Sequence, residues 1–369
     1  MIYLDSAATS FQKPSSVIRA FENTLKTAAS PGRGAYRAAL RAAEAMLDMR
    51  EDAAALFHFP DPERIVMTMN ATHALNLAIR SLVSAGNRVV ISGFEHNAVL
   101  RPLYALGAEV RVAGRTLFNS EEMLEEFRRE LPGAKAAVCT HVSNVFGYVL
   151  PIKEIGKLCK KNGVALILDA SQSAGVLDID CRELGADFIA MPGHKSLLGV
   201  PGSGLLLCGA EASPLFFGGS GGDSMDPEMP PYLPDRLEAG TQNAPAAAAL
   251  SAGIGYIRKA GRSRIEAHEK ELMRHMSALL GKHEEIEQFV SNEDEMSGVL
   301  SFRVKGRDCE MIAQSLGEQG ICVRSGLHCA PLAHESAGTL ESGTVRMSFS
   351  PFNTHAEVET AAAKLIKII

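Results

Sequence analysis

The stretch FIAMPGHKSLLGVPGSG, residues 188–204, is the most informative part of this sequence. An apolar run ends at Met191, and Pro-Gly-His-Lys follows before a loop rich in glycine and proline. Lysine is normally a solvated surface residue. At the end of a buried strand, however, its amine can lose its proton and attack a carbonyl carbon. We therefore weigh Lys195 as a catalytic nucleophile against a solvated loop lysine, and we expect Gly193 to permit a tight turn.

Similar apolar runs precede this stretch and alternate with helical patterns. They are nearly continuous, which is typical of strands covered on both faces. We predict strands at 64–69, 87–93, 135–142, 164–170 and 186–192, and helices over 71–85, from about 97, and over 120–131 with Ser120 as N-cap. Strands interleaved with helices predict an α/β protein with a doubly wound, mostly parallel sheet.

The pattern changes in the last third of the chain. A Pro/Gly-rich region at 216–245 precedes a long Ala-rich helical stretch that begins near Pro245 and reaches about Leu280. Strand and helix patterns then follow up to a last helix from about Thr354. We predict a large domain at 13–245 and a smaller α+β domain built from 1–12 and 246–369.

Composition excludes several function classes. The 369 residues are 46% hydrophobic with a net charge of −6, and no basic tract indicates a nucleic-acid partner. No apolar run reaches the roughly 18 residues of a membrane span, and Asp5 interrupts any signal peptide. The seven cysteines are scattered without a C-x-x-C pair, which argues against disulfides and a metal site and for a reduced, cytoplasmic protein.

Polar residues follow the predicted strands. Taken singly, Asp169 would be read as a helix cap or turn residue, and His96 as a half-buried histidine with its hydrogen bonds satisfied. In doubly wound sheets ligands bind outside the carboxyl ends of the strands, so together these residues indicate a site. The set comprises Ala71-Thr72-His73, Glu95-His96-Asn97, Ser143-Asn144, Asp169 with Gln172, and His194-Lys195.

Pyridoxal 5'-phosphate is the cofactor that needs such a set. It takes a lysine for a Schiff base and an ionised acid facing its pyridine nitrogen. Lys195 and Asp169 meet these needs. The helix start at Ala71-Thr72 offers N–H groups for the phosphate. His96 can stack on the ring, and Gln172 and Asn144 can bind its phenolic oxygen and the substrate.

Nearly the whole chain resembles the cysteine desulfurases and selenocysteine lyases of aminotransferase class V, in particular the SUF-type branch. The matching pieces, in order, are YLDSAATSFQKP, NATHALNL, EHNA, HVSNVFG, DASQSAG, GHK, LEAGT, VRSGLHCA and VRMSFSPFNTHAEV. The resemblance implies a fold-type I enzyme that works as a homodimer with shared active sites.

The resemblance also implies roles for individual residues. Lys195 would carry the coenzyme, and Cys329 would accept sulfur as a persulfide. The remaining implied roles are coenzyme contacts by His96, Asp169, Gln172, Thr72 and His194, a phosphate contact by Thr241 to the neighbouring subunit, and substrate binding by Arg346, Arg324 and Asn144.

The chain departs from the family pattern at three positions. Pro192 stands where a phosphate-binding serine is usual, and Leu327 and Asn97 each replace a histidine. These changes put in doubt the strength of phosphate binding and the proton relay near the cysteine.

We therefore predict an enzyme that releases alanine from L-cysteine or L-selenocysteine and passes the sulfur to a protein acceptor. Two alternatives stay open: another class V reaction, such as transamination or β-elimination, and a non-catalytic persulfide carrier. Cys329 lies in a loop near Arg324 and His328, a setting that favours a thiolate. His328 could help to ionise the thiol or could be a solvent-facing loop histidine.

Overall fold

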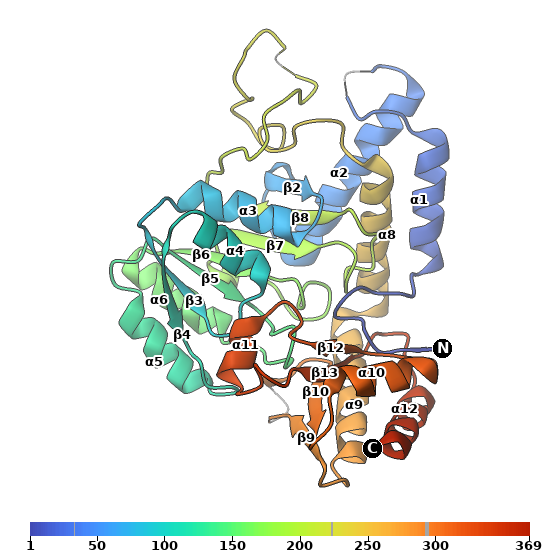
Figure 1. The fold of residues 1–369 in the computed structure, drawn as a ribbon. Helices are drawn as coiled ribbons and strands as arrows, with labels where there is room; N and C mark the ends of the chain where they lie inside the picture. The colour runs from blue at the N-terminus through green and yellow to red at the C-terminus, as the bar shows by residue number, and fades with distance from the viewer. Residues whose placement is uncertain (33, 223, 292–294) are drawn as a thin grey trace.

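The computed structural model describes residues 1–32, 34–222, 224–291 and 295–369 (Figure 1). Its larger part is a seven-stranded sheet of order β2-β8-β7-β6-β5-β3-β4. The strands are β2 (Ile65–Thr68), β3 (Arg88–Ser92), β4 (Glu109–Ala113), β5 (Ala136–Thr140), β6 (Ala165–Asp169), β7 (Phe188–Pro192) and β8 (Gly204–Cys208). Strands β4, β3, β5, β6 and β7 run parallel, whereas β8 is antiparallel to β7 and β2. The predicted α/β class with a mostly parallel sheet is confirmed.

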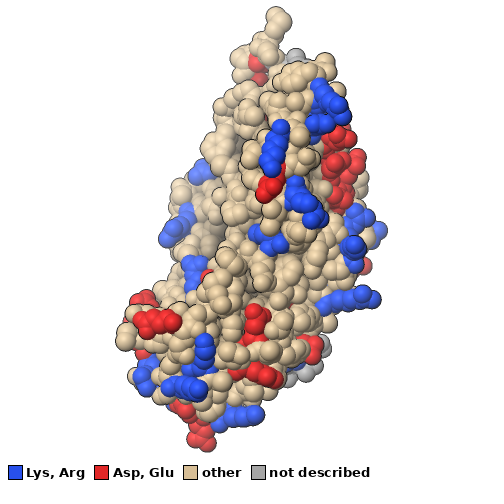
Figure 2. Space-filling model, turned by 90° about the vertical axis from the view of Figure 1, so that its right-hand side faces the viewer, with Lys and Arg blue, Asp and Glu red and all other residues tan. Residues whose placement is uncertain are grey.

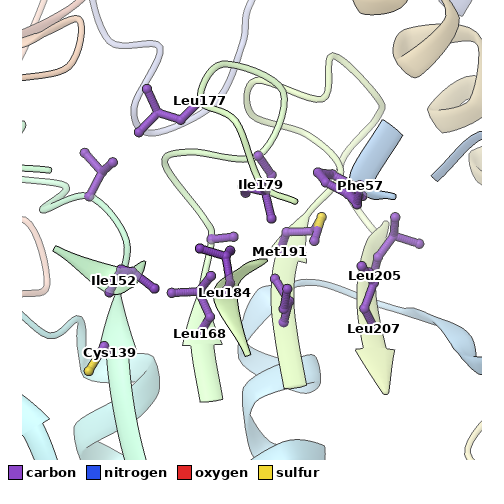
Figure 3. Packing of buried hydrophobic residues seen from close by; sticks show 14 of the residues in the cluster. Phe57, Cys139, Ile152, Leu168, Leu177, Ile179, Leu184, Met191, Leu205 and Leu207 are labelled. Atoms are coloured by element: carbon purple, nitrogen blue, oxygen red, sulfur yellow. The ribbon is translucent and has the colours of Figure 1, made fainter. Parts of the chain in front are cut away.

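Each strand of this sheet contributes side chains to two hydrophobic cores. Within β6, Leu166 and Leu168 belong to one core and Ile167 to the other. Figure 3 shows the first core, in which Leu168, Met191 and Leu205 project from neighbouring strands. Because both faces are covered, the strands read as continuous apolar runs.

Helices cover both faces of the sheet. The first core takes residues from α2 (Arg37–Phe57), α5 (Ser120–Glu130), α6 (Ile152–Asn162), the short α7 (Cys181–Leu184) and α8 (Ala244–Ala260). The second takes residues from α3 (Ala71–Leu82) and α4 (Asn97–Ala105). Helix α1 (Ser15–Thr27) packs against α8 and α2, and the 3-10 turn η1 (Pro62–Arg64) precedes β2. This is the doubly wound arrangement.

A second, four-stranded sheet of order β12-β13-β10-β9 lies beside α9 and α12 (Figure 1). Its strands are β9 (Ile286–Phe289), β10 (Val299–Val304), β12 (Arg324–Gly326) and β13 (Thr344–Ser348). Its core is shared with α9 (Arg262–Leu280), α10 (Cys309–Glu318) and α12 (His355–Ile368). Strand β1 (Ile2–Tyr3) pairs with β11 (Ile321–Cys322), so the N-terminus joins this part. The short helix α11 (Pro331–Ser336) follows β12 in the chain.

Two predictions about helices are wrong in detail. The Ala-rich stretch after residue 245 forms two helices, α8 and α9, because Gly261 between them has a φ of 87° and interrupts the helical backbone. Helix α5 is capped by Asn119, whose side chain accepts the N–H of Glu122, and not by Ser120. The last helix does begin after Thr354, which forms a capping box with Glu357.

On the face seen in Figure 2, acidic and basic side chains are interspersed, and neither kind forms a large patch of its own. Residues 216–243, apart from 223, form the irregular loops between β8 and α8 that protrude in Figure 1. Within the described ranges, no helix combines the length and apolar character that a membrane span requires.

Candidate active site

A cavity of about 170 Å³ lies at the carboxyl ends of β5, β6 and β7. This is the edge at which ligands bind in doubly wound sheets. Eight of the predicted residues line it: Ala71, Thr72, His96, Asn144, Asp169, Gln172, His194 and Lys195. The tertiary structure therefore brings together residues that lie up to 124 positions apart in the chain.

Lys195 and Asp169 provide the two charged groups of this cavity. Burial lowers the pKa of the Lys195 amine to about 8, although the nearby Asp169 carboxylate opposes this change. Asp169 is 2% exposed, and its Oδ1 accepts hydrogen bonds from the backbone N–H and the hydroxyl of Ser171. A lysine with a lowered pKa can supply a neutral amine at moderate pH.

Gly193 precedes this lysine for a reason other than the expected tight turn. Its φ is not among the positive values of the described glycines. A Cβ at this position would lie 2.2 Å from Oγ of Ser203, so the strand ends are too close together for a side chain. The glycine leaves room for the Ser203 side chain, which packs directly against this backbone position.

The start of α3 supplies a candidate anion site in the same cavity. Asn70 caps the helix by accepting the N–H of His73. The first N–H groups of a helix have no acceptor inside it, so those of Ala71 and Thr72 can bind a phosphate or carboxylate. His194 lines the same cavity, and its Nδ1 lies 3.0 Å from Oγ1 of Thr9. Burial lowers the pKa of His194 to about 4.

His96 and Gln172 have partners that orient them. Nδ1 of His96 accepts the N–H of Ala98 over 3.0 Å and so caps α4, which leaves Nε2 to carry the proton of the neutral ring. Burial lowers the pKa of His96 against the influence of Asp169. Nε2 of Gln172 donates to the carbonyl of Ala7 in the N-terminal segment.

Two arginines stand on the small sheet near this cavity. Arg346 of β13 and Arg324 of β12 are direct cross-strand partners. Like charges in this position repel unless an anion lies between them. Arg346 is 2% exposed, and it donates to Asp5 over 2.7 Å and to the carbonyl of Asn144 over 2.9 Å. Neither arginine lines the 170 Å³ cavity.

Cys329 is exposed, in a loop whose backbone is held in place. His328 and Cys329 have φ values of 48° and 57°, a conformation that non-glycine residues adopt only under constraint. The constraint comes from two hydrogen bonds: Asn144 Nδ2 donates to the carbonyl of His328, and the N–H of Asn97 donates to that of Cys329, both over 2.8 Å. The thiol loop is thus attached to residues beside the cavity.

His328 itself does not face solvent, so that interpretation is wrong. Its ring is 5% exposed, contacts Oγ1 of Thr344 through Nε2 and stacks on His334 with a centroid distance of 5.7 Å. Burial and the nearby Arg346 lower the pKa of His328 to about 2. The ring is neutral at moderate pH.

The other six cysteines are buried or half-buried. Burial raises the pKa of Cys159, Cys181 and Cys208 to about 12, and it raises that of Cys139 and Cys309 as well. Thiols in such surroundings are poor nucleophiles. Cys329 is the exposed one of the seven, all of which lie in the described part of the chain.

Thr241 lies away from the Lys195 cavity. It lines a separate hollow of about 440 Å³ together with Met69 and Phe216. The sequence predicts that Thr241 contacts the phosphate bound in a neighbouring subunit. This contact stays a prediction.

Three polar residues of the site were not predicted to act in it. Asn70 and Thr140 line the cavity, and Ser171 binds Asp169. Glu95, which was among the polar residues expected at this edge, is fully buried and accepts hydrogen bonds from the Ser92 hydroxyl and the Thr140 N–H; burial raises its pKa to about 8. Asn70 and Ser171 could have been found from their positions beside Ala71 and Asp169, whereas the role of Glu95 depends on tertiary packing.

Comparisons with known proteins show which family shares this sequence and fold. The aminotransferase class-V family model matches residues 2–360. A probable cysteine desulfurase of Methanothermobacter thermautotrophicus is 34% identical over 100% of this chain and 94% of its own length, and one of Pyrococcus abyssi is 33% identical with the same coverage. The apo structure of a cysteine desulfurase from Thermococcus onnurineus NA1 superposes with a TM-score of 0.93 at 32% identity, covering 100% and 94% of the two chains.

The fold defines an α/β enzyme of the fold-type I class, with a polar cavity at the carboxyl edge of the large sheet. The chain belongs to the class-V aminotransferase family. The predicted family resemblance is confirmed.

Proposed function

We propose that this protein is a pyridoxal-phosphate-dependent cysteine desulfurase, which releases alanine from L-cysteine or L-selenocysteine. The observation that carries the proposal is the meeting of a low-pKa lysine, a buried carboxylate and a helix N-terminus in one cavity, beside a loop with an exposed cysteine. Relatives that match the whole chain are named cysteine desulfurases, which supports the same activity.

The donor set of the cavity fits the coenzyme. Lys195 would bind its aldehyde, and the start of α3 with Thr72 and His194 would hold its phosphate. Asp169 would face the ring nitrogen, His96 the ring face and Gln172 the phenolic oxygen. When bound, the coenzyme supplies a sink for the electrons that amino-acid bond cleavage releases. Pro192 lines the cavity where the family usually has a phosphate-binding serine. Because proline has no hydroxyl, this phosphate site would have one hydrogen bond fewer than a site with that serine.

The chain's own residues account for the other steps. Arg346, with Arg324 opposite it, would bind the substrate carboxylate, because a guanidinium fork matches a carboxylate. The Lys195 amine, with its pKa of about 8, would take the α-proton. Asn144 would orient the substrate and, through the His328 carbonyl, the thiol loop.

Sulfur transfer would then occur at Cys329. Its thiolate attacks the substrate sulfur; an S–S bond forms as the substrate Cβ–S bond breaks. The electron pair stays with the carbon skeleton, which takes up a proton and leaves as alanine. The persulfide on Cys329 is exposed, so a protein acceptor can collect its outer sulfur.

We further propose a homodimer. Exposed apolar side chains occur at the start of and along α2 (Tyr36, Leu40 and Leu47), between β2 and α3 (Met69) and on the 216–243 loops (Phe216 and Phe217). Patches of this kind mark interaction surfaces, and Thr241 lies beside Met69 and Phe216. A cytoplasmic location fits the seven free thiols.

A product assay tests the activity. The purified holoenzyme is incubated with L-cysteine and, separately, with L-selenocysteine, each with a dithiol that reduces the persulfide and releases its outer atom, and alanine, sulfide, selenide and pyruvate are measured. Alanine with sulfide or selenide supports the proposal. Pyruvate would instead indicate β-elimination, and the absence of every product would indicate a non-catalytic carrier.

A further inference from the structure

The ion pair between Asp5 and Arg346 occupies the site to which we assign the substrate carboxylate. Oδ1 of Asp5 lies 2.7 Å from Nη2 of Arg346. The arginine side chain is 2% exposed and that of Asp5 is 19% exposed, so Asp5 is the member on the solvent side. The inference below rests on the proposed function, since it concerns the carboxylate site of that reaction.

Asp5 accepts a hydrogen bond from only part of the Arg346 guanidinium group. Nη1 donates to the carbonyl of Asn144, whereas Nε is buried and has no hydrogen-bond partner among the described residues. Nε and Nη2 form the edge of the fork that binds a carboxylate through two parallel hydrogen bonds. Asp5 takes one of these donors and leaves the other unmatched, which is costly for a buried polar group.

A second positive charge stands close to the pair. Arg324 is the cross-strand partner of Arg346, and its charge contributes to lowering the pKa of both Lys195 and Arg346. Asp5 therefore balances only one of two neighbouring arginines. A substrate carboxylate that bound both Nε and Nη2 would replace one charge-assisted hydrogen bond with two.

We propose that Asp5 is the internal counter-ion of Arg346 in the substrate-free enzyme and that the substrate carboxylate displaces it. Asp5 is thereby a positioning residue: it keeps the buried guanidinium paired and oriented until an amino acid arrives. It also sets the affinity of the site, because every carboxylate ligand must compete with it.

The same chain segment contacts the coenzyme-binding residues, so displacement has a route to the lysine. Ala7 accepts a hydrogen bond from Gln172. Ser10 donates through its hydroxyl to the carbonyls of His194 and Lys195, over 2.9 and 3.0 Å. Lys13 donates to the His194 carbonyl over 3.1 Å. Residues 5–13, the N-terminal segment, thus link the carboxylate site to the Lys195 loop.

Coupling follows from this geometry. When Asp5 leaves Arg346, the N-terminal segment loses its ion pair, and its remaining contacts hold the Lys195 loop less firmly. We expect the carboxylate to loosen the backbone around the lysine at the moment when the lysine must be released from the coenzyme.

Two measurements on the holoenzyme test the proposal, with L-alanine as the probe. Calorimetric titration compares the wild type with Asp5→Asn. The variant leaves the Arg346 charge uncompensated, so we expect L-alanine to bind at least about tenfold more tightly. Hydrogen exchange then follows residues 2–13 of the wild type, where saturating L-alanine should accelerate exchange at least about threefold, since broken contacts lower local protection.

The matched control is Asp52→Asn, which removes a carboxylate from an ion pair with Arg258 away from the cavity. It should change neither measurement. Weaker or equal L-alanine binding by Asp5→Asn, or exchange in residues 2–13 that slows or stays constant, would overturn the proposal. The exchange experiment uses the wild type and does not depend on the folding of a variant.

Arg346→Lys separates this proposal from the proposed function. If Arg346→Lys binds L-alanine as the wild type does, Arg346 is not the carboxylate site and both the assignment and the role of Asp5 fail. If the wild type releases alanine from L-cysteine but Asp5→Asn binds L-alanine no better, the desulfurase function stands and the displacement is wrong.

Discussion

The side chain of Asn144 donates a hydrogen bond of 2.8 Å to the backbone carbonyl of His328. Its own backbone carbonyl accepts a hydrogen bond from Arg346. One residue at the end of a strand of the large sheet therefore positions both the thiol loop and the arginine of the small sheet.

Asn144→Asp should uncouple the thiol loop from the cavity. The new carboxylate oxygen would face the His328 carbonyl without a proton to donate, which removes a bond and adds repulsion worth about 1–3 kcal/mol. We expect persulfide on Cys329 to form about tenfold more slowly per molecule of bound coenzyme. Mass spectrometry after brief exposure to L-cysteine measures the rate of persulfide formation. A rate equal to that of the wild type would contradict the expectation. Asn162→Asp, on the surface of α6, is the control.

Lys195→Ala should abolish covalent attachment of the coenzyme. Two lysines near the site have a pKa lowered by burial to about 8, Lys195 and Lys13, but only Lys195 lines the cavity. Borohydride should therefore fix the coenzyme to the wild type and to Lys13→Ala and not to Lys195→Ala. Peptide mapping of the reduced proteins identifies the lysine. Coenzyme fixed to Lys195→Ala at the wild-type level would refute the assignment.

Asp169→Asn should retain the coenzyme and lose most of the turnover. The amide can still accept the hydrogen bonds from Ser171, but it carries no charge to keep a ring nitrogen protonated. Each lost pKa unit corresponds to about 1.4 kcal/mol, or tenfold in equilibrium. The turnover of alanine release and the bound coenzyme are measured together. Ser171→Ala, which keeps the carboxylate, should retain more than half of the activity; near-normal turnover in Asp169→Asn would mean that this carboxylate does not act on the ring.

Cys329→Ala should bind the coenzyme normally but form no persulfide, because the exposed thiol is gone and the remaining cysteines are shielded. Alanine release from L-cysteine should fall at least about a hundredfold, a loss of roughly 3 kcal/mol of transition-state stabilisation. Release from L-selenocysteine should fall less, since selenium is the better leaving group. Cys181→Ala serves as control, and unchanged alanine release by Cys329→Ala would rule out the persulfide step.

The protein should become less stable in acid because of its buried histidines. Burial lowers the pKa of His334 to about 4, whereas the same residue titrates near 6.5 when unfolded. Between these values the unfolded chain binds more protons, so the free energy of unfolding falls as pH decreases through this window. At about pH 5 the free energy of unfolding is lower by roughly 2 kcal/mol, because this histidine binds a proton in the unfolded chain and not in the folded one.

His334→Gln should therefore show a smaller loss of stability between about pH 7 and about pH 5, by roughly 2 kcal/mol. Urea unfolding at the two pH values measures the difference. The surface substitution His355→Gln provides the comparison, since His355 is exposed on α12. An equal acid-induced loss in His334→Gln and wild type would show that this ring is not the titrating group.

The amino-acid sequence by itself determined the class of sheet and the residues at its edge. Apolar runs such as 164–170 are continuous because both faces of the sheet are covered, and this pattern can be read locally. The residue that follows a parallel strand must lie at the carboxyl edge, so Asp169 and Lys195 could be placed near each other without coordinates.

Tertiary structure alone decided which partners these residues have. The burial of His328 and the close approach of Gly193 to Ser203 depend on packing between segments that are not adjacent in the sequence. The ion pair of Asp5 with Arg346 joins residues 341 positions apart. Local patterns encode periodicity and capping, whereas burial, pKa and the pairing of distant charges arise only when the folded chain removes water from between them.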